Sequence, residues 1–344
     1  MSKNNRGLVL ITGAAGFTGH HMVAEAVRSG FKVRATDVSS RHYGAMFEAL
    51  DVEFVKSDLT RREGLEQIAA DCDSVIHVAG IHDYSTPDEI IFAVNAKAVE
   101  NLCDASIKAG VKRFMHISSV GVYGYSSNPG KPVKEDDPKV TPPLNNYNLS
   151  KWEGEKTVHK YIKEKGFAAT IFRPAAIYGS RSEYGLYLVF KMAYDERNKK
   201  KKLILGKGDK IEAFLHIEDM CRAVFHAYDH EEMIGEAYNV ADDTHIPTTE
   251  FYNLVNLELL GMEKPFLHLP LAVAKPLAVV SQFIARRTGK KPLLEKATLD
   301  YVNCDKIWDN TKLKATGFEF KYPTLEKGIA ETLAWYKDNG WFRF

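Results

Sequence analysis

A glycine-rich turn near the start of the chain constrains the fold more than any other feature of the sequence. Residues 7–12 form a short apolar, β-branched run that predicts a buried parallel strand. The run leads into Gly-Ala-Ala-Gly-Phe-Thr-Gly at residues 13–19, and residues 20–29 continue with a helical pattern. A strand, a glycine turn and a helix in this order indicate a dinucleotide-binding βαβ unit.

Each glycine of the turn has its own physical role. Gly13 permits the tight turn, Gly16 lets the backbone approach a pyrophosphate, and Gly19 allows close packing of the helix on the strand. The free N–H groups at the start of the helix then face the phosphates. We therefore expect this turn to contact a dinucleotide cofactor.

The acid at the end of the second strand bears on which dinucleotide is bound. Residues 31–36 predict this strand, and Asp37 follows it, 18 residues after Gly19. An acid there accepts hydrogen bonds from the adenosine ribose and repels a 2′-phosphate. The nearest following arginine is Arg41, so we expect NAD and consider NADP the less favoured cofactor. The alternative role for Asp37 is that of a turn or helix-cap residue.

Further strands alternate with helices along the first half of the chain. Their pattern predicts an α/β fold built on a doubly wound parallel sheet. His77 lies inside the fourth strand, where we expect it to be packed rather than catalytic. Asp58 follows the third strand and either binds the adenine amino group or caps a helix that begins near Thr60. The expected strands are residues 52–56, 74–79, 113–118 and 167–172, and the expected helices are residues 88–109, 147–165 and 325–338.

Bulk composition excludes several classes of protein. The chain has 344 residues, enough for one large or two modest domains, and a formal net charge of +1, which gives no argument for nucleic acid as a partner. Its four cysteines lie far apart, so we expect neither a metal site nor a disulfide framework. No apolar stretch approaches the roughly 18 residues of a membrane span. We expect a soluble, cytoplasmic protein.

A tyrosine and a lysine four residues apart open the helix at residues 147–165. Tyr147 and Lys151 stand on the same helix face. A free phenol has a pKa near 10, and an ammonium group held close to it lowers that value towards the range useful for acid–base catalysis. On a surface helix the same spacing also occurs without any function, so the pair needs partners supplied by the rest of the chain.

The partners are present, and together the motifs resemble the extended short-chain dehydrogenase/reductases, the family of NAD-dependent epimerases, dehydratases and 3-beta-hydroxysteroid dehydrogenase-like enzymes. The resemblance covers roughly the first 180 residues, with later echoes at residues 214–219 and 237–240. Its motifs are Thr12-Gly-x-x-Gly-x-x-Gly19, Asp37, Asp58, His77-Val-Ala-Gly80, Ser118-Ser119, Tyr123-Gly124, Tyr147-x-x-x-Lys151 and Arg173-Pro174.

The resemblance implies roles for these residues. Tyr147 would be the general acid/base on the substrate oxygen, Lys151 would lower its pKa and bind the nicotinamide ribose, and Ser119 would donate a hydrogen bond to the reacting oxygen. Pro174 would pack near the nicotinamide. The full set implied to contact the cofactor is Gly13, Ala15, Gly16, Phe17, Asp37, Asp58, Leu59, Val78, Ala79, Gly80, Tyr147, Lys151 and Pro174.

The resemblance also implies a division of the chain and an assembly. We expect a dinucleotide-binding domain from residues 1–178 and 209–241, and a smaller, mostly helical substrate domain from residues 179–208 and 242–344. Many members of the family form homodimers through two long helices, which correspond here to residues 88–109 and 147–165. We therefore expect a homodimer.

Departures from the family's pattern bear on the substrate. Many nucleotide-sugar members carry an asparagine where this chain has Ala176, and an arginine in the segment where it offers only Lys210. Binding a diphosphate needs positive charge and donors. Lys207 and Arg181 could partly substitute, so the nucleotide-sugar branch is weakened without being excluded.

An apolar segment in the C-terminal region favours another branch. Residues 267–284 resemble the hydrophobic helix of 3-beta-hydroxysteroid dehydrogenase-type members, and Arg286, Arg287, Lys290 and Lys291 follow. The segment is an ordinary core helix, a wall over an apolar substrate, or an interfacial helix whose basic cluster contacts lipid head groups, so that residues 267–291 make weak membrane-surface contact. Two prolines exclude a spanning helix. The lysine run at 199–202 is expected to be a solvated loop.

From these features we expect an NAD-dependent oxidoreductase. It would interconvert a secondary alcohol and a ketone on an apolar sterol- or terpenoid-like substrate. The alternatives are a nucleotide-sugar epimerase or dehydratase with tightly bound NAD, and a non-catalytic NAD(H)-sensing protein. A sensor has no need of Ser119, Tyr147 and Lys151, which disfavours that last alternative.

Overall fold

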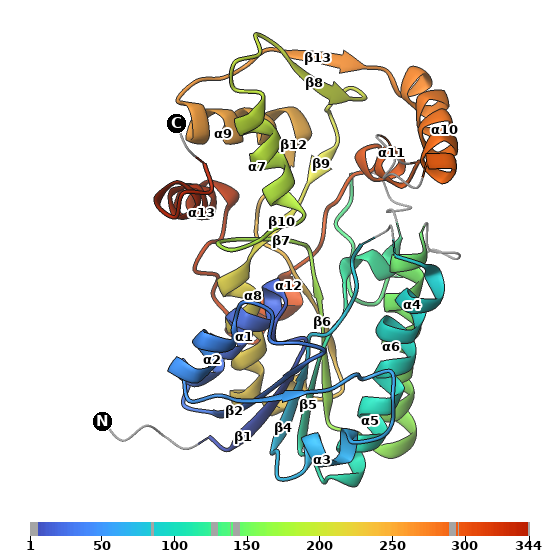
Figure 1. The fold of residues 1–344 in the computed structure, drawn as a ribbon, viewed down its shortest axis with the longest axis vertical. Helices are drawn as coiled ribbons and strands as arrows, with labels where there is room; N and C mark the ends of the chain where they lie inside the picture. Colours follow the sequence, from blue (N-terminus) through green and yellow to red (C-terminus); the bar gives the residue numbers. More distant parts are fainter. Residues whose placement is uncertain are drawn as a thin grey trace.

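The fold is taken from a computed structural model, which describes residues 6–83, 86–124, 130–137, 139, 145–288, 294 and 296–342. Its lower part is a sheet with helices on both faces, and its upper part is a smaller group of helices and short strands (Figure 1). Segments 179–208, 245–288 and 296–302 all contribute to the upper part (Figure 1).

The central sheet has seven parallel strands in the order β11-β6-β5-β4-β1-β2-β3. The doubly wound α/β prediction is confirmed, and so are the six predicted strands. The motif at 237–240 adds a seventh strand that the sequence analysis did not predict. The strands are β1 (Leu8–Thr12), β2 (Lys32–Asp37), β3 (Glu53–Lys56), β4 (Ser74–His77), β5 (Arg113–Ile117), β6 (Ala169–Pro174) and β11 (Ala237–Val240).

The strand order reverses at β1, which pairs with β2 on one side and β4 on the other. In open α/β sheets a ligand binds outside the carboxyl ends of the strands at such a point. The glycine turn after β1 and residues 78–80 after β4 meet there. The topology therefore places the predicted cofactor residues at one crevice.

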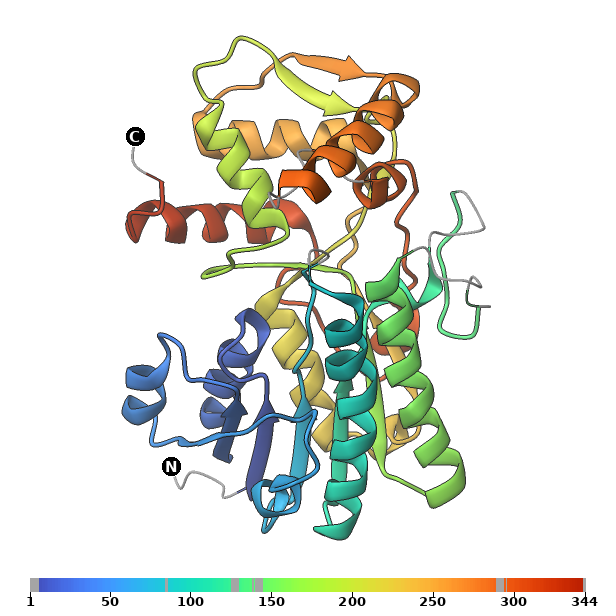
Figure 2. The same ribbon diagram turned by 45° about the vertical axis from the view of Figure 1, so that its right-hand side comes forward.

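Two apolar clusters bind helices to the faces of the sheet. One contains residues of α1 (Phe17–Arg28), α2 (Gly44–Ala49) and α8 (Ile217–His226). The other contains residues of α3 (Leu65–Ala69), α5 (Ala98–Lys108) and α6 (Asn146–Lys165). Figure 2 shows α5 and α6 side by side along the second face. The helix with the Tyr-x-x-x-Lys spacing is thus anchored to the sheet along its length.

The predicted helix at 88–109 is in fact three pieces. It consists of α4 (Asp88–Phe92), a π-helical segment η1 (Ala93–Lys97) and α5. A π turn holds one residue more than an α turn and is often found at functional sites. Here it carries the buried Asn95, whose amide contacts two other segments.

The upper part has its own core, in which α7 (Leu186–Asp195), α9 (Thr248–Leu260) and α13 (Leu325–Asp338) pack together. The predicted helix at 325–338 is confirmed as α13, and within it Tyr336 is buried and donates a hydrogen bond to the Ser182 carbonyl oxygen. The remaining elements are η2 (Val120–Tyr123), β7 (Ala176–Tyr178), β8 (Lys202–Leu205), β9 (Ile211–Glu212), β10 (Phe214–His216), β12 (Ile246–Pro247), β13 (Phe266–Leu269), α10 (Leu271–Thr288), α11 (Lys296–Val302) and α12 (Thr311–Ala315).

The lysine run at 199–202 differs from its prediction in one residue. Lys199, Lys200 and Lys201 are exposed, as expected of a solvated loop. Lys202 is buried in β8, where its ammonium group donates a hydrogen bond of 2.6 Å to the carbonyl oxygen of Ala193. That bond compensates for the loss of water around its charge. In the described part of the chain, no helix has both the length and the hydropathy that crossing a membrane requires.

The contact between α6 and η1 gives a test of the packing. A Cβ atom at Gly154 would lie 2.3 Å from the backbone oxygen of Asn95. We expect Gly154→Ala to lower the free energy of unfolding by about 1–3 kcal/mol, because overpacking outweighs the gain in helix propensity. Urea unfolding followed by circular dichroism measures the change.

A helical glycine with room around it serves as the control. At Gly44 a Cβ atom would be 3.5 Å from the Ser40 hydroxyl oxygen, an ordinary contact. Gly44→Ala should leave stability unchanged or raise it by up to about 1 kcal/mol. Equal effects of the two substitutions would contradict the close approach of α6 to η1.

Candidate active site

The glycine turn between β1 and α1 has no room for side chains at two of its three glycines. Gly13 has a φ of +64°, and a Cβ atom there would lie 2.6 Å from the Cα atom of Ala79. A Cβ atom at Gly19 would lie 1.9 Å from the Gly13 oxygen. Gly16 is the N-cap of α1 and provides no capping side chain. The turn therefore presents bare backbone at a helix N-terminus, as a pyrophosphate site requires.

Asp37 lies at the end of β2 beside this turn. One carboxylate oxygen accepts a hydrogen bond of 3.1 Å from the Ala15 N–H group, and the other accepts one of 2.7 Å from the Val38 N–H group. The carboxylate is half-buried, so it keeps an open side. Ala15 is buried and Phe17, the first residue of α1, is half-buried. Asp37 is thus fixed next to the glycines with which it is expected to share a cofactor.

Asp58 accepts hydrogen bonds within the turn that follows β3. Its carboxylate accepts hydrogen bonds from the Thr60 N–H group at 3.0 Å and the Thr60 hydroxyl at 2.7 Å. Arg61 is 3.8 Å away, and the bonds from Thr60 lower the pKa of Asp58. Leu59 is buried. The predicted helix near Thr60 is wrong, because the next helix, α3, begins at Leu65 with Gly64 as its N-cap. Asp58 therefore stabilises a turn and not a helix, and adenine binding stays a prediction.

Residues after β4 and β6 complete the expected cofactor set. Val78 and Ala79 are half-buried, and the Ala79 N–H group donates a hydrogen bond to the Thr12 hydroxyl. Gly80 is exposed, and a Cβ atom there would lie 3.8 Å from the Lys151 ammonium nitrogen. Pro174 ends β6 and is buried. His77 is buried and shares a 2.8 Å hydrogen bond with the Thr12 hydroxyl, which confirms that it is packed.

Tyr147 and Ser119 meet at the start of α6. The Asn145 side chain caps this helix by accepting a 2.8 Å hydrogen bond from the Asn148 N–H group, which places Tyr147 in the first turn. The side chains of Tyr147 and Ser119 are hydrogen-bonded to each other. The Ser119 hydroxyl also accepts a 3.0 Å bond from the Gly121 N–H group. The expected hydroxyl pair is thus assembled.

Lys151 is buried one helical turn further on. Its ammonium group donates a hydrogen bond of 2.7 Å to the carbonyl oxygen of Ile117, at the end of β5. Burial lowers the pKa of Lys151 to about 8, although Glu155 opposes this shift. Burial also raises the pKa of Tyr147, and the Ser119 hydrogen bond offsets only part of this. The expected depression of the tyrosine pKa is therefore absent here, because the loss of hydration around the phenol dominates.

Three residues near this pair were not identified from the sequence. Asn95 accepts a hydrogen bond from the Ile81 N–H group at 2.8 Å and donates to the Ser150 hydroxyl at 3.0 Å, which ties the loop after β4 to α6. Gly154 permits the close approach of α6 to Asn95. His82 packs its ring edge-on against Tyr147, with ring centroids 4.7 Å apart. An asparagine directly after the apolar run at residues 90–94 was the available signal for Asn95.

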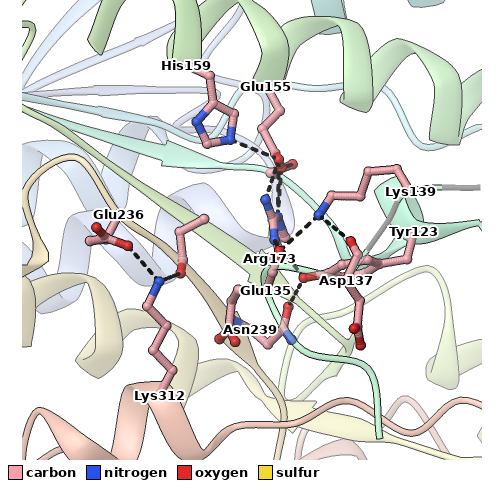
Figure 3. A network of polar contacts seen from close by, with 12 residues as sticks. Tyr123, Glu135, Asp137, Lys139, Glu155, His159, Arg173, Glu236, Asn239 and Lys312 are labelled. Carbon is pink, nitrogen blue, oxygen red and sulfur yellow. Dashed lines mark hydrogen bonds and ion pairs between the residues drawn. The ribbon is translucent and has the colours of Figure 1, made fainter. Parts of the chain in front are cut away.

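A buried ionic network surrounds Arg173 and Glu155 (Figure 3). The Arg173 guanidinium donates to Glu155 at 2.7 Å and 3.1 Å, and to the Tyr123 hydroxyl at 2.6 Å. Ser118 donates to Glu155 at 2.6 Å, and the Tyr123 hydroxyl donates to Asn239 at 2.7 Å. All five side chains are buried. The network thus joins α6, β6, η2 and β11 with Ser118, the residue that follows β5.

The network holds Glu155 ionised. Burial alone would raise its pKa, but the hydrogen bonds from His159, Arg173 and Ser118 and the charge of Arg173 hold the pKa well below its usual range. A surface pocket of about 310 Å³ beside the network is lined in part by Arg173 and His159. Sequence reasoning noted Arg173 and Ser118 only as motif residues, and their joint partner Glu155 was missed because the three lie on separate elements.

The described residues of the chain contain no group of three or more His, Cys, Asp or Glu side chains that could hold a metal ion. What the structure brings together is a bare glycine turn, an acid at the next strand end, and a Ser–Tyr pair above a buried lysine. The turn fits a dinucleotide, and the hydroxyl pair fits proton transfer to or from an oxygen.

Residues 9–241 match the model of a family described as the NAD dependent epimerase/dehydratase family. This match spans more than half of the chain and includes every residue of the candidate site.

Two curated proteins are similar along most of the chain. One is the N-acetyl-alpha-D-glucosaminyl-diphospho-ditrans,octacis-undecaprenol 4-epimerase of Escherichia coli O157:H7, which is 25% identical and aligned over 94% of each chain. Another is the 3beta-hydroxysteroid-dehydrogenase/decarboxylase isoform 1 of Arabidopsis thaliana, which is 26% identical over 94% of this chain and 78% of its own.

Among solved structures, the fold is similar to that of UDP-glucose 4-epimerase from Thermotoga maritima in complex with UDP-glucose. The TM-score is 0.77 at 23% sequence identity, and the match covers 96% of this chain and 99% of the other. At this identity the likeness concerns the fold.

The position of Asp37 generates a test of cofactor choice. Asp37→Asn keeps an acceptor for Ala15 and removes the charge. Affinity for NAD should fall about 10–100-fold, because hydrogen bonds to charged groups contribute roughly 1.5–3 kcal/mol. Affinity for NADP should rise relative to NAD, since the repulsion of a 2′-phosphate is lost. Isothermal titration calorimetry measures both, and an unchanged ratio would contradict the assignment.

Asp58→Asn is the matched control, because Asp58 has its bonds to Thr60. We expect it to change NAD affinity less than Asp37→Asn does. A loss as large as that of Asp37→Asn would instead support adenine binding by Asp58.

The buried pair predicts a pH-dependent stability difference. Glu155→Gln leaves the Arg173 charge unpaired, so we expect a loss of about 3–5 kcal/mol in the free energy of unfolding at pH 7. The folded pKa of Glu155 is depressed, so its contribution is fully present above the unfolded value of about 4.3 and is lost as the pH falls towards the folded pKa. The difference between wild type and variant should therefore shrink on acidification.

Urea unfolding between neutral pH and about pH 3 measures this difference. Glu153→Gln is the control on the same helix, because Glu153 forms an exposed pair with Lys156 at 2.8 Å. Such a pair contributes at most about 1 kcal/mol. A pH-independent loss in Glu155→Gln would argue against an ionised Glu155.

Proposed function

The chain belongs to the NAD dependent epimerase/dehydratase family, and we propose that it interconverts a secondary alcohol and a ketone on an apolar, sterol- or terpenoid-like substrate. The observation that carries the proposal is the Ser119–Tyr147 hydrogen bond above the buried ammonium of Lys151. When bound, NAD accepts a hydride from the alcohol carbon or returns one to the ketone. The protein's part is to orient the substrate oxygen and to move its proton.

Tyr147 is the proton carrier in this proposal. With its pKa above the ordinary value, Tyr147 is a neutral phenol at neutral pH, the form that donates a proton to a ketone oxygen in reduction. In oxidation the phenolate form of Tyr147 would take the hydroxyl proton of the substrate as the alcohol becomes the ketone. Ser119 donates a hydrogen bond to the same oxygen and fixes its position.

Lys151 is the cation proposed to assist Tyr147. Its ammonium group is anchored on the Ile117 oxygen, close to Gly80 at the end of the cofactor crevice. A buried cation one helical turn from Tyr147 favours the phenolate form as the reaction proceeds. It also lies where the nicotinamide ribose is expected.

Charge around the substrate segments supports an apolar substrate. Lys210, the only cation in the stretch where sugar-nucleotide members often carry arginine, forms an ion pair with Asp305 at 3.8 Å. Arg181 stacks over the Trp335 ring at 5.5 Å. Both cations thus have partners within the chain, which reduces their capacity to hold a diphosphate. The similar 3beta-hydroxysteroid dehydrogenase/decarboxylase supports the same class of substrate.

A second candidate is an epimerase or dehydratase of a sugar diphosphate with tightly held NAD. The observation that favours it is the similar undecaprenol-linked 4-epimerase, which aligns over 94% of both chains. In such a reaction the hydride returns to the substrate, so NADH does not accumulate.

We also propose that the protein is a homodimer joined through α5 and α6, as expected from the resemblance.

The reaction is tested by incubating the protein with NAD and a panel of hydroxysteroids, UDP-sugars and dTDP-sugars. We expect NADH to appear with a steroid alcohol. Conversion of a sugar without net NADH would favour the second candidate. Binding of NAD without turnover of any compound would support the sensing alternative.

Tyr147→Phe tests the mechanism. We expect turnover to fall about 10²–10⁴-fold, the usual contribution of a general acid/base, while NAD affinity stays within about twofold. Asn146→Ala, at the exposed neighbouring position of α6, is the control and should keep turnover. Near-normal turnover by Tyr147→Phe would remove Tyr147 from the proton path.

A further inference from the structure

Helix α10 buries small residues and exposes large apolar ones, which is the opposite of what a core helix does. Its inward face is a stripe of small residues at which Ala274 and Ala278 are buried against Leu299 of α11. Ser281, one turn further on, accepts a 3.1 Å hydrogen bond from the Leu294 N–H group. The interpretation of 267–284 as an ordinary core helix is therefore wrong, because among the described residues of α10 Leu271 is the one large apolar side chain that packs against this cluster, and the other large apolar side chains are exposed.

The bulky apolar residues of α10 face outward instead. They recur at three- and four-residue spacings, which places them together on the side opposite the alanine stripe. Each is between 48 and 64% exposed. They are Val273, Leu277, Val279, Val280, Phe283 and Ile284. Exposed apolar surface of this extent on one helix marks an interaction site.

A neighbouring sheet edge adds to this surface. β8 and β13 pair in parallel, and Leu203 stands opposite Leu267 in their register. Both side chains are at least half exposed, at 50 and 58%. β13 leads into α10 through Pro270, and Figures 1 and 2 show β8, β13 and α10 together on the outside of the upper part.

Positive charge is concentrated in the same two segments. Residues 199–210 contain six lysines and one acid, Asp209, and residues 262–288 contain four basic residues and one acid, Glu263. Of the six lysines, Lys202 is buried, and Lys199 and Lys210 pair with Glu196 and Asp305. The whole chain has a formal net charge of only +1. Lys275 and Arg287 are exposed on α10 itself. The apolar surface thus lies in a basic field.

We propose that the outward face of α10, with Leu203 and Leu267, docks on an anionic lipid surface. An apolar helix face with basic residues beside it lies in the plane of the head groups, with its apolar side chains reaching the acyl boundary. α10 has 18 residues with Pro276 inside it, and none of the described helices fits a membrane span. Contact is therefore peripheral.

Charge distinguishes lipid from the other occupant of such a face, a second copy of this chain. Two copies meeting through α10 would bring two basic segments together, and like charges repel. An anionic head-group layer meets the same charges favourably, each basic side chain near the surface strengthening binding about fivefold. The inference does not rest on the proposed redox reaction, since docking needs no substrate.

Flotation with vesicles tests the proposal. Purified protein is mixed with vesicles of phosphatidylcholine alone, or of phosphatidylcholine with phosphatidylglycerol, and centrifuged through a density gradient. We expect the protein to float with the anionic vesicles at least tenfold more strongly than with the neutral ones, and salt to weaken the binding. Wild-type protein that stays at the bottom with anionic vesicles would overturn the proposal.

Two sets of substitutions locate the contact. Val280→Glu with Phe283→Glu should reduce binding to anionic vesicles at least tenfold, and Lys275→Glu with Arg287→Glu should abolish the preference for anionic over neutral vesicles. Leu188→Glu, at an equally exposed leucine of α7, is the control and should float like wild type. Circular dichroism checks that each variant is folded.

Other outcomes overturn the proposal. If Val280→Glu with Phe283→Glu floats as well as wild type, the surface is not α10. If wild type does not float and sedimentation velocity shows a dimer that the same substitutions dissociate, the occupant is a second copy. Loss of NAD-dependent turnover in a variant that still floats would show that α10 belongs to the substrate site instead.

Discussion

The ion pair between Arg173 and Glu155 is the interaction on which the arrangement of the site depends. Two charges out of water are costly unless every donor and acceptor is satisfied, and here Ser118, Tyr123 and His159 complete the set. The two charges lie on β6 and α6, and their partners come from η2, from α6 and from the residue after β5. A shift of α6 against β6 would therefore leave a buried charge unpaired. We call this buried network the clamp; its members are Arg173, Glu155, Ser118, Tyr123, His159 and Asn239.

The clamp positions the proposed catalytic residues through the chain neighbours of its members. Lys151 lies one helical turn before Glu155, and Ser119 follows Ser118 in the sequence. Successive residues of an extended strand point to opposite sides, so Ser118 reaches the clamp while Ser119 reaches Tyr147. The buried network thus fixes the distance between helix α6 and the end of β5. This distance determines how Tyr147 and Ser119 meet in the crevice.

Features that depend on a short stretch of the chain could be predicted from the sequence. The strands, the glycine turn, Asp37 and the helix with Tyr147 follow from short apolar runs and from residues that only certain backbone shapes accept. Asn95, Gly154 and Glu155 depend on contacts between elements distant in the sequence, and no spacing rule identifies such partners. The π segment has the same origin, since the buried amide of Asn95 finds its bonds on Ile81 and Ser150. For α10, periodicity detected an apolar helix but not its orientation, although the small residues at 274, 278, 281 and 285 were a readable signal for the inward face.

The seventh strand has a consequence for how the molecule comes into being. β11 supplies Asn239 to the clamp and pairs with β6, yet it is made only after the segment 179–236, part of which forms the upper part. During synthesis the central strand β1 emerges first. Strand β11, at one edge of the same sheet, is synthesised more than two hundred residues later. Long-range closure of this kind is slow, and a nascent chain that ends before residue 237 exposes the β6 edge and leaves Tyr123 without its amide acceptor. The central sheet is thus completed only after part of the upper part has been synthesised.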